Sequence, residues 1–156
     1  MLSSIHPLGE RTRGSSWSIT TTAYVFGSVV GGTTLGVLGG SLGWLVLREA
    51  RPEALLVVFG ALAVLALLRE WDLVKFALPS IHRQVDENWL LEYRGWVYGI
   101  GFGFQLGLGV VTIITTASLH LMIVAVVLGA SPLLGALVGA TFGLVRGGFV
   151  LLGRRI

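Results

Sequence analysis

The sequence predicts an all-α protein that crosses a membrane about four times. Of its 156 residues, 54% are hydrophobic and 12% are charged, and the apolar residues lie in long runs. Soluble domains carry about 25% charged residues. A transmembrane β-barrel would show alternating segments of about ten residues, and these runs do not alternate. The predicted fold class is therefore a polytopic helical membrane protein with glycine-zipper packing, an interrupted third span and one interfacial amphipathic helix.

The first part of the chain divides into a tail and a span. Residues 1–19 are predicted to form a polar N-terminal tail that is not a secretory signal, because they contain no apolar core of the required length. Residues 20–153 are predicted to form a single transmembrane domain. Its first span, residues 20–47, is uncharged and long enough to cross about 30 Å of hydrocarbon. This span is either a packed helix or a helix that unwinds near Thr33 and Thr34.

The second span is predicted at residues 54–75. Residues 54–68 are the most lipid-like stretch but are short, so snorkelling of Arg69 and Lys75 is needed to extend them. Pro79 ends or kinks this helix. Residues 80–94 then place apolar side chains at helical spacing and charged ones between them, which predicts an amphipathic helix in the membrane interface.

The third span is predicted to be broken. Residues 95–130 contain no charge, and a straight helix of that length would be about 54 Å long, too long for one crossing. The polar stretch from Thr112 to His120 is the predicted break within a span at residues 96–129. The last span is predicted at residues 133–153. If residues 95–153 cross three times instead of twice, the chain has five spans.

The basic residues predict the topology. With four spans, both ends of the chain and the connection at residues 69–94 share one side, which holds most of the Arg and Lys residues. We expect the protein to lie in the inner membrane of the cell. The positive-inside rule then places that side, and both termini, in the cytoplasm. Topology and lipid headgroups thus explain the net charge of +3, and nucleic acid is not a predicted partner.

Glycines at four-residue spacing predict where the helices meet. Positions four apart stack on one face of a helix, and small residues let two membrane helices approach closely. The predicted packing positions are Gly27, Gly31, Gly36, Gly99, Gly103, Gly107, Gly135, Gly139, Gly143 and Gly147.

A few polar residues inside the apolar runs are candidates for a pathway or a ligand. Arg146 is the only charge between Gly95 and Gly153, and it either contacts an anion or snorkels to the headgroups. His120 is either a proton or ion relay or a marker of the outer interface. Gln105 bonds either a substrate or another helix. The full candidate set is Arg146, His120, Thr112, Thr115, Thr116, Gln105, Thr33 and Thr34.

Several kinds of chemistry are not predicted. The chain has no cysteine, which excludes thiol chemistry within it. Its three histidines fall in different segments without ligand spacing, so no metal site or other cofactor is expected. No catalytic constellation lies in an apolar setting, and the chain is not expected to be an enzyme.

Two segments resemble a known family. Tyr24-Val-Phe-Gly27 leading into Thr33-Thr34, and the glycine-rich run from Gly99 to Gly109 leading into Thr112 and Thr115, resemble the starts of the two repeats of the cytochrome c biogenesis and thiol-disulfide interchange membrane domains. That resemblance implies kinship with small-solute exporters. The sequence lacks the family's cysteines and flanking prolines, so electron relay and its site residues are not carried over.

Two functions follow from these observations. The threonine patch, the broken span and Arg146 favour a small-solute or ion transport or channel protein, acting as a self-associating half-size unit in the lipid bilayer. The alternative is a non-catalytic accessory or scaffold subunit of a larger membrane complex. The absence of acidic residues deep in a span and the amount of packing surface favour this alternative.

Overall fold

A computed structural model of the chain describes residue 14 and residues 16–76, 93–109 and 117–152. Most of the predicted N-terminal tail at residues 1–19, and nearly all of the predicted interfacial helix at residues 80–94, lie outside these residues. The last three residues of that tail, 17–19, belong to the first helix, which begins at Trp17. So do three of the candidate pathway residues, Thr112, Thr115 and Thr116.

The described residues are helical and contain no strand, which confirms the prediction of an all-α fold. The helices are α2 (Trp17–Leu47), α3 (Pro52–Glu70), α5 (Gly95–Leu108), α6 (Ala117–Leu128) and α7 (Pro132–Leu152). Three of them, α2, α3 and α7, are long and apolar enough to cross a membrane, and α6 is a shorter apolar helix.

The second helix ends earlier than predicted. It stops at Glu70 instead of reaching residue 75, because the chain turns back on itself there. Asp72 has a positive φ of 56°, and the backbone amides of Leu73 and Val74 both bond to the carbonyl of Leu68. The Arg69 Nε atom also donates to the carbonyl of Phe76 at 3.0 Å, which holds the turn against the helix.

The first helix is continuous where unwinding was one of the alternatives. Thr33 and Thr34 lie inside α2, and each hydroxyl donates to the carbonyl four residues before it, at 2.8 Å. Two described helices, α5 and α6, lie within the third predicted span, and the interruption of that span stays a prediction. Gly109 ends α5 with a positive φ of 68°, and α6 already begins at Ala117. His120 therefore lies in a helix and not in the break.

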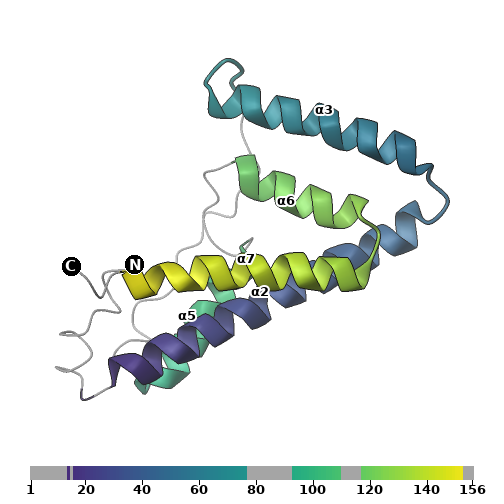
Figure 1. Cartoon of the computed structure of the whole chain (residues 1–156). Coiled ribbons are helices and arrows are strands. Elements are labelled where there is room, and N and C mark those ends of the chain that lie inside the picture. Colours follow the sequence, from purple (N-terminus) through teal and green to yellow (C-terminus); the bar gives the residue numbers. More distant parts are fainter. Residues whose placement is uncertain (1–13, 15, 77–92, 110–116, 153–156) are drawn as a thin grey trace.

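Helix α2 is the centre of the fold. It lies between α7 and α5, and these two pairs share the most extensive contacts in the structure (Figure 1). The buried aromatic side chains of Tyr24, Tyr98 and Phe102 pack with Val150 near the first half of α2. The rings of Tyr98 and Phe102 meet edge to face with centroids 6.3 Å apart.

Two rows of glycine on α2 face two different helices. Gly27 and Gly31 face the backbone of α5, and Gly32, Gly36 and Gly40 face the start and middle of α7 and the turn before it. Helices α5 and α7 also carry glycines at these contacts. A Cβ atom would overlap backbone atoms of another helix at Gly99, Gly103, Gly107, Gly135, Gly139 and Gly143. The helix axes can approach this closely only because both surfaces lack side chains.

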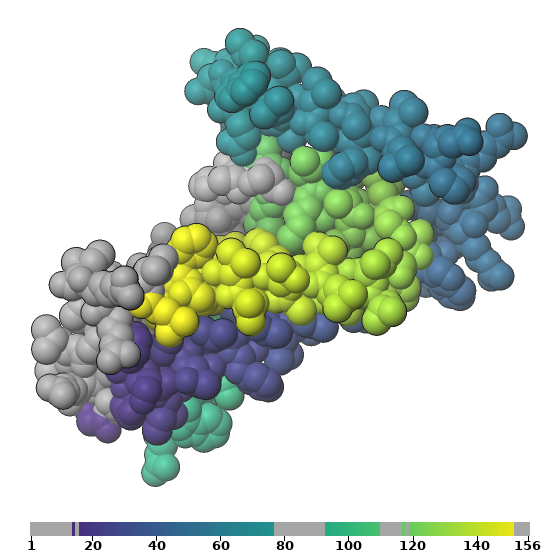
Figure 2. All heavy atoms as spheres, viewed as in Figure 1, coloured from purple at the N-terminus to yellow at the C-terminus, as the bar shows by residue number. Residues whose placement is uncertain are grey.

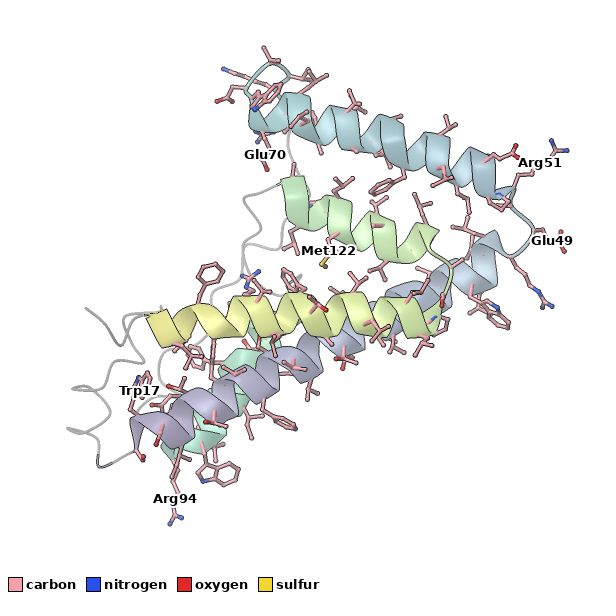
Figure 3. The ribbon with its side chains drawn as sticks, in the orientation of Figure 1. Trp17, Glu49, Arg51, Glu70, Arg94 and Met122 are labelled. Carbon is pink, nitrogen blue, oxygen red and sulfur yellow. The ribbon has the colours of Figure 1, made fainter. Side chains whose placement is uncertain are left out.

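Helices α3 and α6 form an outer pair. Figure 1 shows α6 between α3 and the α2–α7 pair, and Met122 points from α6 towards α7 (Figure 3). Helix α3 contains no buried residue, and Figure 2 shows it along one edge of the molecule. Leu56 and Val57 are 70% and 72% exposed. In a bilayer such side chains would face lipid tails.

The close packing of α2 predicts opposite outcomes for two glycine-to-alanine substitutions. Gly36→Ala places a methyl group against the backbone of Gly135, so we expect a loss of about 1–3 kcal/mol of unfolding free energy. Gly148→Ala meets no atom within 4 Å and removes a weak helix former, so it should be neutral or stabilising by up to about 1 kcal/mol. Reversible unfolding in mixed detergent micelles, followed by circular dichroism, measures both. Equal stability of the two variants would contradict the packing.

Candidate functional site

Arg146 lies where α7 passes the break between α5 and α6. It is half-buried, and its guanidinium stands 5.6 Å from the centre of the Phe142 ring, one turn earlier on α7. The same ring and the side chain of Leu119 both lie beside Gly109, which ends α5. A cation over an aromatic face in a desolvated place is stabilised by up to about 2 kcal/mol. Arg146 thus has a partner within its own helix.

The other candidate residues that the structure describes belong to three other helices, α2, α5 and α6. His120 is half-buried in the first turns of α6, where it already takes part in an interaction. Gln105 lies half-buried on α5. The hydroxyls of Thr33 and Thr34 bond back to α2 itself. The described part of the chain therefore places these polar groups on four different helices.

Glu70 is a functional residue that the sequence analysis missed. Its carboxylate accepts a hydrogen bond of 2.6 Å from the backbone amide of Ala117, the first residue of α6. Figure 3 shows Glu70 pointing from the end of α3 towards the start of α6. The first amides of a helix have no partner within the helix, and a carboxylate there also offsets the positive end of the helix dipole. Glu70 therefore links the end of α3 to the start of α6.

Sequence reasoning had placed every acidic residue outside the apolar cores of the spans. That holds for Glu70 in the sequence, since Arg69 and Glu70 end the apolar run of α3. In space, α3 ends beside the start of α6, so this carboxylate meets the first amide of another helix. No local pattern indicates that residue 70 meets residue 117.

Ser28 is the second residue that the sequence analysis missed. It is fully buried, and its hydroxyl donates to the carbonyl of Gly143 on α7 at 2.9 Å. The same residue faces Gly103 and Gly107 on α5. One small polar side chain thus stands where the three helices meet. A serine inside a glycine-rich apolar span is the available signal, because such residues form hydrogen bonds across membrane helices.

The described polar side chains make contacts within the chain and do not form a recognisable catalytic or metal site. Among the residues that the structure describes, no three His, Asp or Glu side chains gather closely enough to hold a metal ion. The charged groups Glu70 and Arg146 contact a helix end and an aromatic ring of the same chain. The first contact joins α3 to α6, and the second lies within α7.

The chain is similar to proteins named methylamine utilization protein MauF. It is 25% identical to that of Methylophilus methylotrophus over 147 residues, which is 93% of the chain and 52% of the relative. It is 29% identical to that of Methylobacillus flagellatus over 126 residues, 78% of the chain and 44% of the relative. The identity to that of Paracoccus versutus is 31% over 123 residues, 79% of the chain and 44% of the relative.

The chain spans about half the length of these relatives. No family model matches the chain, and no solved structure matches it. The predicted resemblance to the cytochrome c biogenesis and thiol-disulfide interchange membrane domains, and to related exporters, is therefore wrong. It rested on glycine and threonine, which occur in any tightly packed membrane helix.

The Glu70 contact predicts a local effect on α6. Glu70→Ala removes the acceptor of the Ala117 amide, and losing a helix cap costs about 1 kcal/mol. We expect backbone amides at the start of α6 to exchange with deuterium about fivefold faster, as that loss implies. Hydrogen–deuterium exchange of the purified protein in detergent measures this.

Glu53→Ala is the matched control, because Glu53 lies in the first turn of the same helix, at its other end. It should leave exchange in α6 unchanged. If both variants, or neither, alter exchange in α6, the capping role of Glu70 is refuted.

Proposed function

We propose that this chain is a non-catalytic accessory protein of a membrane complex that serves methylamine utilization. The observation that carries the proposal is the similarity to methylamine utilization proteins MauF along 78% to 93% of the chain. The proposal takes from these relatives only the process that their name states. It concerns the part that this chain shares with them.

The helix contacts support an accessory role over transport. Both glycine rows of α2 are occupied by α5 and α7, so the centre of the bundle is filled by backbone. The threonines of α2 bond to their own helix, and Arg146 is held over Phe142. These groups are three of the eight candidates for a pathway, and each has a partner within the chain.

The outer helix supports the same role. No residue of α3 is buried, and it packs mainly on α6. A rigid three-helix centre that carries an apolar outer pair leaves a large surface for lipid and for other subunits. Accessory subunits need such a surface, because they act through contacts and not through a reaction of their own.

The accessory role predicts foreign partners. When an affinity-tagged chain is purified in mild detergent from cells of its source organism grown on methylamine, we expect other subunits to copurify in fixed proportion. Native mass spectrometry of the eluate measures their number and mass. The same purification from cells grown on a carbon source without methylamine is the control, and should yield fewer partners. A clean homo-oligomer under both conditions would contradict the proposal.

The broken span keeps transport as the second candidate. A pathway through this region would depend on Arg146 of α7 and His120 of α6. In proteoliposomes that contain the purified chain, the accessory role predicts no methylammonium flux above that of empty vesicles. Flux that Arg146→Ala abolishes, in a variant that still folds, would favour transport instead.

A further inference from the structure

A cleft opens where α2 ends, α3 begins and α6 ends. Its volume is about 620 Å³, within the usual range of small-molecule sites. Apolar side chains line most of it, including Leu55, Leu56 and Phe59 of α3 and Leu128 of α6. All of its lining residues belong to the described part of the chain.

The mouth of this cleft carries one charge. Arg48 lines it beside Trp44, and the guanidinium stands 5.5 Å from the centre of the Trp44 ring. The neighbouring charged residues Glu49, Arg51 and Glu53 do not line the cleft. Figure 3 shows Glu49 and Arg51 at the outer edge of the turn, pointing away from the space between α3 and α6. The charge presented to an occupant is therefore positive.

The length of α2 places the mouth at headgroup depth. The helix has 31 residues and is about 46 Å long at 1.5 Å per residue. A bilayer with its headgroup regions is about 40–45 Å thick. Trp17 begins this helix, and Trp44 lies one turn before its end. Tryptophan is enriched at both interfaces of a membrane, so the two residues mark opposite headgroup layers.

We propose that this cleft binds one anionic phospholipid, with an acyl chain between α3 and α6 and the phosphate on Arg48. An acyl chain fits the apolar wall because the cleft opens sideways between two helices that otherwise face lipid. The phosphate fits Arg48 because a guanidinium presents several donors to phosphate oxygens. Arg48 and the cleft lie together at the depth where a phospholipid holds its phosphate. This site is independent of the accessory role.

Arg48 and Arg51, which lie close together in the chain, allow the role of Arg48 in lipid binding to be tested against a matched control. The purified, delipidated protein is titrated with phosphatidylglycerol or phosphatidylcholine of identical acyl chains, and bound lipid is counted by native mass spectrometry. The wild type should bind the first phosphatidylglycerol more tightly than phosphatidylcholine. Arg48→Gln should weaken that binding about tenfold, the size of one lost charge-assisted hydrogen bond. Arg51→Gln keeps the cleft intact and should bind as the wild type does.

The position of the acyl chain needs its own variant. Ala125→Phe fills the wall of the cleft from α6 and leaves Arg48 in place. It should lower phosphatidylglycerol binding as strongly as Arg48→Gln. In vesicles with a small fraction of brominated phosphatidylglycerol, tryptophan quenching should be saturable in the wild type, and Trp44→Phe should remove the saturable part.

Three results would overturn the proposal. The first is equal binding of both lipids by the wild type. The second is an equal fall in Arg48→Gln and Arg51→Gln, which would indicate charge attraction without a site. The third is unchanged binding by Ala125→Phe, which would place the lipid outside the cleft. Circular dichroism and gel filtration establish that each variant is folded.

Discussion

The fold depends on how closely α2 approaches two other helices at the same time. Lipid tails give apolar helices no hydrophobic reason to associate, so contact between backbones has to supply the attraction. Gly27 and Gly31 allow it on the side of α5, and Gly32 and Gly36 allow it on the side of α7. Ser28 lies between the two rows and adds a hydrogen bond to Gly143. The remaining helices are arranged around this centre.

The sequence predicts this architecture in outline because its strongest signals are local. Long uncharged runs indicate helices, and an apolar run too long for one crossing indicates a break between α5 and α6. The end of α3 was placed too late, because the turn after Glu70 depends on a positive φ at Asp72 and on bonds back to Leu68. The predicted extension of this helix to residue 75 rested on snorkelling of Lys75, which takes no account of these contacts.

The candidate site was harder to predict, since one contact joins distant parts of the chain and the other depends on a side-chain rotamer. Arg146 stands out in the sequence as a lone charge, but its position over Phe142 depends on the rotamer and helix face. Glu70 looks like an ordinary helix end, and only the packing of α3 on α6 brings it to Ala117. The family resemblance failed for a related reason, because glycine and threonine report on packing and not on descent.

The loose attachment of α3 has a consequence for how the chain is made. Ribosomes release helices in order, and α3 emerges before α6, which is the helix that α3 mainly contacts. Until then α3 has lipid as its main surrounding. It is the most apolar of the three candidate spans. A helix that is surrounded by lipid before its partner is made needs such an apolar surface. Helix α2 can close its glycine surfaces only when α5 and then α7 arrive, so the centre of the fold is completed last.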